Sequence, residues 1–154
     1  MKHELIFDRT IDDVKLAKKI RSEKFLRGIK LTQEESDIME RGILTINTIN
    51  RIEANQNQIW EFLQNIGYWN INIENKKWNN TDLFVDSDSN RLINNIEILI
   101  EGFFTYSNTP GVPSTFYDYK SINDIEKIIH DLHLMIMDVT ENYRECGNIE
   151  CGGD

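Results

Sequence analysis

The sequence predicts a mainly α fold, a helical bundle of three principal helices with short N-terminal helices and a small strand or hairpin element. The first observation is a five-residue phrase, Ile-Asn-x-Ile-Glu, which occurs at 49–53, 93–97 and 122–126. Each copy opens, or lies early in, a segment whose apolar residues recur with helical spacing. The second is the length of 154 residues with 40% hydrophobic side chains, which suits one domain, 1–154, with a single core.

The N-terminal third is expected to hold an arm and two short helices. Residues 1–10 form a possible arm, either extended or a short strand. Thr10 is a hydroxyl cap followed by acids in the first turn, which predicts a helix start. That helix is expected to end near Gly28. The box Thr32-Gln33-Glu34-Glu35 predicts a second helix that runs to Gly42.

Two long helices and the strand element are expected in the middle of the chain. The first long helix should cover about 46–65. Residues 69–78 alternate apolar and polar side chains, which is the period of a half-buried strand. The second long helix should begin near Asp86 or Asp88, either of which can cap it. The breaker segment 107–113, which contains both prolines, should follow it.

The third long helix has the most regular pattern. Its apolar residues alternate in steps of three and four for three heptads: Ile122, Ile125, Ile129, Leu132, Ile136, Val139 and Tyr143. This spacing is typical of a coiled-coil or bundle seam. The glycine-rich tail, 145–154, is expected to be flexible or extended.

The repeated phrase has two structural interpretations. Asn followed three residues later by Glu resembles a helix N-terminal box, which suits Asn123 well and Asn50 poorly. Alternatively, these side chains flank the core and hydrogen-bond across helices, which fixes register. A di-metal carboxylate site is a third idea, but none of Glu53, Glu97 and Glu126 has the following His that such bundles use.

Charge and hydropathy exclude several classes of partner. The net charge is −9, from 26 acidic and 17 basic residues, which argues against a nucleic-acid groove and an anionic membrane surface. The basic run from Lys15 to Lys30 is interpreted as a solvated helix face. No apolar run approaches the roughly 18 to 20 residues that span a bilayer, and no secretory signal core is evident.

The inventory for catalysis or metal binding is thin. His130 and His133 are neighbours on one helix without an evident third ligand. Cys146 and Cys151 both lie near the end of the chain, where ordinary thiols in a terminal loop or hairpin are expected. Nucleophile elbows and phosphate-binding loops are absent. We therefore predict a protein that is not an enzyme, with no catalytic, cofactor-binding or metal-binding residues.

Aromatic and apolar side chains around the expected strand form the candidate partner interface. It comprises Trp69, Ile71, Ile73, Trp78, Tyr117 and Tyr119. Trp69 and Trp78 bracket the strand, and exposed aromatic anchors dominate binding energy at interfaces. The alternative is that this strand simply packs over the bundle.

Several phrases resemble those of one protein family. The stretch 46–53, with 63–68 downstream, is similar to a segment of uncharacterised virion proteins from tailed phages and prophages of low-GC Gram-positive bacteria. In that family an Asn-Arg-(Val/Ile)-Glu phrase opens a helix that ends in Gly-Tyr. Residues 121–128 resemble the family's Ala-Asn-Asp-Ile-Glu-Lys-Ile phrase. Further agreements are Asp8-Arg9-Thr10, Pro110-Gly111-Val112-Pro113 and Cys151-Gly152.

The resemblance spans residues 8–152 and implies a structural protein of the tail tip, baseplate or fibre region. Such a protein would be made in the host cytoplasm and found in the virion, bound to other virion proteins, in a homo-oligomer or symmetric multimer. The family's Trp-rich turn before the second long helix is replaced here by Asn79-Asn80-Thr81-Asp82. A rival from another class is a small regulatory or inhibitory binding protein that acts in the infected cell.

Overall fold

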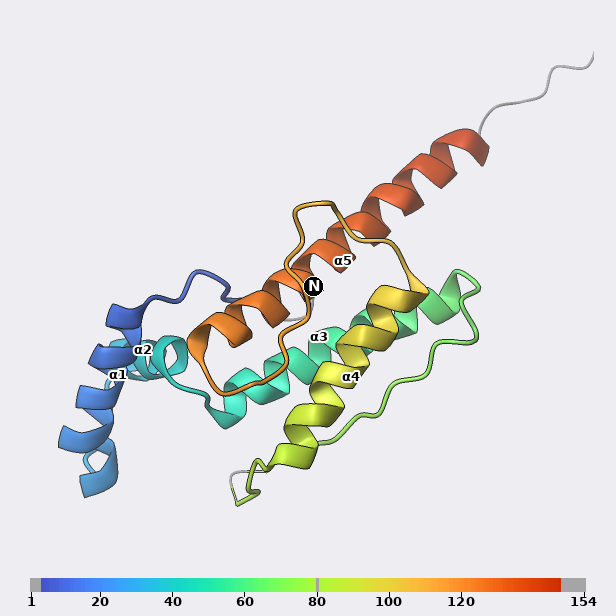
Figure 1. Ribbon diagram of the computed structural model, residues 1–154. Helices are drawn as coiled ribbons and strands as arrows, with labels where there is room; N and C mark the ends of the chain where they lie inside the picture. Colours follow the sequence, from blue (N-terminus) through green and yellow to red (C-terminus); the bar gives the residue numbers. More distant parts are fainter. Residues whose placement is uncertain (1–3, 80, 148–154) are drawn as a thin grey trace, which may run out of the picture.

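The computed structural model describes residues 4–79 and 81–147, and it is mainly helical, which confirms the predicted class. Its helices are α1 (Ile11–Glu23), the 3₁₀ helix η1 (Phe25–Arg27), α2 (Gln33–Gly42), α3 (Ile46–Asn65), α4 (Asp86–Gly102) and α5 (Tyr119–Gly147) (Figure 1). No strand occurs among the described residues. None of these helices is long and apolar enough to cross a bilayer.

The main hydrophobic core lies between α3, α4 and α5. Each of these helices contributes apolar side chains that are fully or almost fully buried, for example Ile52, Ile96 and Ile129. The loop before α5 adds Phe116, which is also buried. The buried positions of the three helices belong to the apolar stripes of the sequence, because a helix that buries one face repeats apolar residues about every 3.6 positions.

A second, smaller core lies in the N-terminal hairpin, which we define as α1, η1 and α2. It is built on Ala17, Ile20 and Met39. Figure 1 shows this hairpin beside the N-terminal end of α3, away from the distal end of α5. The predicted cap at Thr10 and the predicted box at Thr32 are both present, because each hydroxyl accepts a backbone N–H at 3.2 Å.

Helix α4 begins at Asp86, as predicted, but the structure corrects its predicted cap and the expected start of α5. Val85 is the N-cap of α4, and the Asp88 carboxylate accepts the Val85 N–H at 3.2 Å from inside the helix. The Asp118 carboxylate accepts the Ser121 N–H at 2.8 Å at the start of α5. Asn123 therefore lies within the helix, and its interpretation as an N-terminal box is wrong. The helix also includes 145–147, which were expected in the tail, while 148–154 lie outside the described residues.

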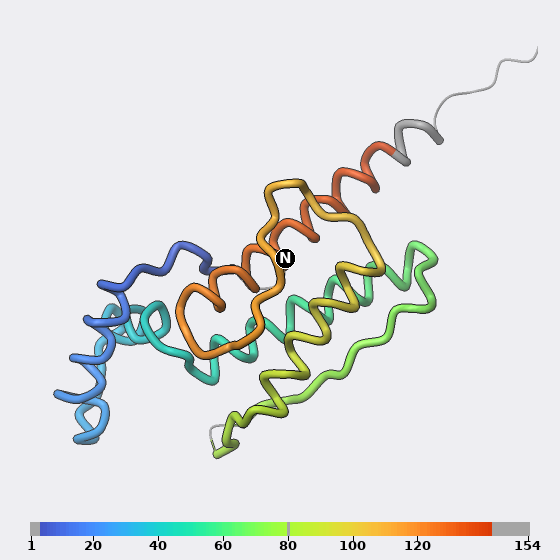
Figure 2. Tube along the Cα trace, viewed as in Figure 1, coloured from blue at the N-terminus to red at the C-terminus, as the bar shows by residue number. Residues whose placement is uncertain are grey.

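The predicted strand at 69–78 is wrong, although its alternation is real. The segment is extended and runs from the end of α3 toward the start of α4 (Figure 2). Side chains of the helices bind its backbone: Trp60 Nε1 donates to the Ile71 carbonyl at 2.8 Å, and Asn95 Oδ1 accepts the Glu74 N–H at 3.0 Å. A period of two reports burial of one face of an extended chain, whether or not another strand pairs with it.

Candidate functional site

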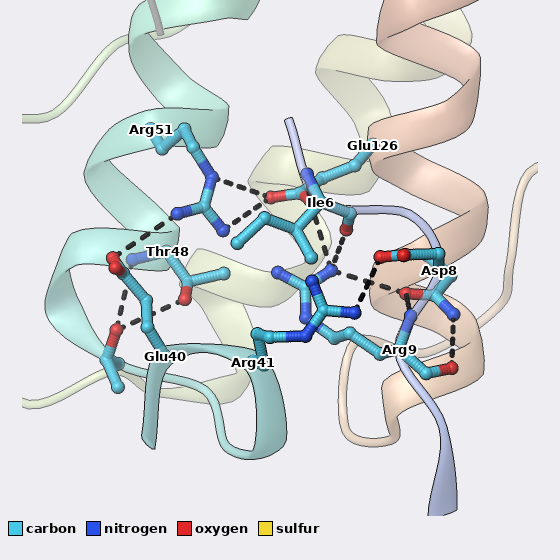
Figure 3. A network of polar contacts seen from close by, with 10 residues as sticks. Ile6, Asp8, Arg9, Glu40, Arg41, Thr48, Arg51 and Glu126 are labelled. Atoms are coloured by element: carbon cyan, nitrogen blue, oxygen red, sulfur yellow. Dashed lines mark hydrogen bonds and ion pairs between the residues drawn. The ribbon is translucent and has the colours of Figure 1, made fainter. Parts of the chain in front are cut away.

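A buried ionic network is centred on Glu126 of α5 (Figure 3). One carboxylate oxygen accepts Nε and Nη2 of Arg51 at 3.0 and 2.9 Å. The other accepts Nη1 of Arg9 at 3.1 Å and the backbone N–H of Ile6. Arg51 also reaches Glu40 of α2 at 3.3 Å. Both arginines and Glu126 are buried, so removing one charge would leave another buried without a counter-charge, which is costly.

The Glu126 network fastens the N-terminal arm onto α5. Asn123 accepts the Arg9 N–H at 3.2 Å and donates to the Arg9 carbonyl at 3.0 Å. Burial lowers the pKa of the Arg9 guanidinium, and the charge of Glu126 opposes that effect. Arg41 of α2 binds Asp8 of the arm at 2.9 Å. Polar contacts thus connect the hairpin, with its separate small core, to the main bundle.

A second network is centred on Glu53 of α3. Its carboxylate binds Arg91 of α4 and accepts the Trp78 indole N–H at 2.8 Å and the Lys76 backbone N–H at 2.9 Å. Asn95 also donates to the Glu74 carbonyl at 2.8 Å. These bonds hold the extended segment against α3 and α4. The glutamate therefore positions the chain between helices, as the cross-helix interpretation of the repeated phrase proposed.

Exposed aromatic side chains gather where α3 and α4 end. We define the aromatic end as Ile66, Tyr68, Trp69 and Phe104. Trp69 is 74% exposed and Phe104 is 71% exposed. The rings of Tyr68 and Phe104 are linked through the buried Phe103, which lies 5.4 Å from Tyr68 and 5.8 Å from Phe104 between ring centroids. Such a group of exposed apolar side chains is typical of a binding surface.

The six predicted interface residues differ in how exposed they are in the structure. Trp69 and Tyr117 are exposed, and Tyr119 is half-buried. The prediction is wrong for the other three, because they belong to the main hydrophobic core: Ile71, Ile73 and Trp78. Tyr117 and Tyr119 line a cavity of about 350 Å³ between the hairpin and the start of α5, apart from the aromatic end. The predicted set is therefore not one surface.

The candidate metal-binding side chains do not gather at one place in the part of the chain that the structure describes. Among the described residues, no group of three or more His, Cys, Asp or Glu could hold a metal ion. The His130 ring packs 5.0 Å from the Phe7 ring, and burial lowers the pKa of His133. Glu97, in the second copy of the phrase, is exposed. Cys146 lies in α5, and Cys151 lies outside the described residues.

Sequence reasoning missed the arginines and the role of Phe104. Arg51 stands inside the repeated phrase, so a basic residue next to core positions was an available signal for a buried partner. Arg9 and Arg91 gave no comparable signal, because they lie outside the repeated phrase. Phe104 fits the apolar face of a longer α4, but the helix ends at Gly102 and the ring points outward.

Comparisons of this chain with protein-family models, with curated proteins and with solved structures found no match. Function therefore has to be argued from the residues and their arrangement. Among the described residues, the arrangement includes two buried networks that fix the helices and the exposed aromatic end.

Proposed function

We propose that this protein is a structural component of a phage virion, in the tail tip, baseplate or fibre region, where it acts as an assembly or docking module. The aromatic end carries the proposal. Trp69 and Phe104 expose most of their surface, and large aromatic side chains are the residues that most often anchor protein interfaces. The proposed location in the virion comes from the phrases that resemble those of the virion protein family.

The same reasoning supports a non-enzymatic protein whose partners are other virion proteins and further copies of itself. Buried networks around Glu53 and Glu126 fix how the helices pack. At the aromatic end itself, the Gln64 amide donates to the carbonyls of Tyr68 and Ile71, which holds this surface in one shape. A surface fixed before binding loses less conformational entropy when a partner docks. The net charge of −9 disfavours nucleic acid and anionic membranes as partners.

Mass spectrometry of purified phage particles tests the proposal. We expect the protein at a copy number stoichiometric with known tail proteins. Phage that carry Trp69→Ser together with Phe104→Ser should assemble fewer complete tails. Leu83→Ser is the matched control, because Leu83 is an exposed apolar residue outside the aromatic end. Protein found only in infected-cell lysate would contradict the proposal and favour the regulatory alternative.

A further inference from the structure

The turn between α1 and α2 exposes apolar side chains. We define the hairpin tip as residues 24–30, which contain η1 and Gly28. The turn is closed by the Ile29 N–H, which donates to the Lys24 carbonyl at 3.0 Å. Phe25 and Leu26 are 57% and 67% exposed, and Ile29 is exposed as well. None of the three belongs to the small core of the hairpin.

The hairpin tip is also cationic. It contains Lys24, Arg27 and Lys30 and no acidic residue. Lys24 is paired with Glu35 of α2. Arg27 and Lys30 form no ion pair with any residue that the structure describes. Their charges are therefore free to meet an acidic surface.

Charges of the opposite sign flank the aromatic end. The segments that carry its four residues, 61–70 and 97–106, contain three acidic residues and no Lys or Arg. Glu97 and Glu101 are exposed on the last two turns of α4, seven and three residues before Phe104 in sequence. Neither glutamate is in an ion pair within the described ranges. Both surfaces are thus apolar, and their charges are of opposite sign, so the aromatic end is complementary to the hairpin tip.

One copy cannot bring the two surfaces together. The hairpin joins the first residue of α3, and the aromatic end follows the last. A helix of 20 residues is about 30 Å long. Figures 1 and 2 show the hairpin and the end of α3 on opposite sides of the molecule. Complementary patches at opposite ends of one subunit make a head-to-tail contact, which closes into a ring or continues as a filament.

We infer that the hairpin tip binds the aromatic end of a second copy of this chain. Phe25, Leu26 and Ile29 pack against the exposed aromatic rings, and Arg27 and Lys30 face the acids at the end of α4. The inference rests on the proposed assembly role, and it identifies a second copy of the chain as one partner in that assembly. An anionic lipid surface would attract the same cations, but the net charge of −9 opposes the approach of the whole molecule.

Charge reversal in the full chain provides the first test. Analytical ultracentrifugation should show self-association that increases with concentration and weakens as salt screens the charges. R27E with K30E, or E97K with E101K, should each weaken association about tenfold or more. A chain with all four substitutions should associate again, because both surfaces are reversed together. K19E is the control, since Lys19 is an exposed cation of α1 outside the tip.

Apolar truncation provides the second test. Leu26→Ser and Trp69→Ser should each weaken self-association by about thirtyfold, the size of a hot-spot loss. Leu83→Ser is the control, and circular dichroism checks that each variant keeps its helices. Permanently monomeric wild-type protein, or a fourfold charge variant that stays dissociated, would overturn the inference. So would Arg27-dependent binding to vesicles of anionic lipid in place of self-association.

The two proposals can fail separately. Stoichiometric protein in purified virions, together with a chain that never self-associates, would reject the head-to-tail contact and leave the virion role standing. Head-to-tail association of a protein that is absent from virions would reject the virion role alone.

Discussion

Arg51 directs two hydrogen bonds, from Nε at 3.0 Å and Nη2 at 2.9 Å, to the same carboxylate oxygen of Glu126. Arg51 is the third residue of the first Ile-Asn-x-Ile-Glu phrase, and Glu126 is the last residue of the third. Two copies of the repeat therefore bind each other inside the protein. A buried ion pair contributes modest net stability after desolvation, but removing one partner is costly. We expect this pair to fix how α3 and α5 pack.

Loss of the Glu126 charge should strongly destabilise the fold. Glu126→Gln leaves Arg9 and Arg51 buried without their shared counter-charge, which should lower the free energy of unfolding by about 3–5 kcal/mol. Urea denaturation measures the change. Glu97→Gln alters the equivalent position of the second phrase, where the side chain is exposed, and should change stability by less than about 0.5 kcal/mol. Equal effects of the two substitutions would refute a special role for the Glu126 network.

Asn95 should stabilise the attachment of the extended segment, 69–78, to α4 and have little effect on the stability of the rest of the fold. Asn95→Ala removes the acceptor of the Glu74 N–H and one of the two donors to the Glu74 carbonyl, which keeps Arg91, and this loss should cost about 1–3 kcal/mol. Amide hydrogen exchange should accelerate first in residues 69–78 and much less in α5. Asn94→Ala is the control, because Asn94 lies beside it on α4 and is exposed. Uniform acceleration across the chain would argue against this local attachment.

Gly42 should tolerate no side chain, because α1 and α2 approach each other there. A Cβ at this position would lie 2.2 Å from the Asp13 carbonyl oxygen and 2.3 Å from the Ala17 Cβ. Gly42→Ala should therefore destabilise the N-terminal hairpin by about 1–3 kcal/mol. Thermal unfolding compares it with Gly111→Ala, where a Cβ meets nothing within 4 Å. Unchanged melting of Gly42→Ala would show that the hairpin opens at little cost.

Acid should destabilise the protein through Asp131. Burial raises the pKa of this carboxylate, but hydrogen bonds from Lys127, Thr109 and His130 outweigh burial and hold the pKa below that of an ordinary aspartate. The unfolded chain therefore binds a proton more readily than the folded chain. This contribution is complete above about pH 4 and is lost as the pH falls below that value. Unfolding measured between pH 5 and pH 3 should show a shallower loss for Asp131→Asn than for wild type.

The helices were largely predictable because their signals are local. Apolar spacing placed α3 at the residues where the structure has it, and the caps at Thr10 and Thr32 were recognised from a few neighbouring side chains. The strand prediction failed because alternation in 69–78 identifies a buried face and carries no information about a pairing partner. Asn123 was misassigned because α5 begins earlier, at Tyr119.

The sequence by itself determined the helical class, most helix positions and the buried apolar stripes, because these follow from periodicity and capping within a few turns of chain. Only the tertiary structure decided that Glu126 meets Arg9 and Arg51, that Trp78 is buried, and that Trp69 is exposed. Those outcomes depend on contacts between residues up to 117 positions apart. The spacing of residues along the chain cannot predict these contacts, because contacts between distant residues depend on how whole helices pack.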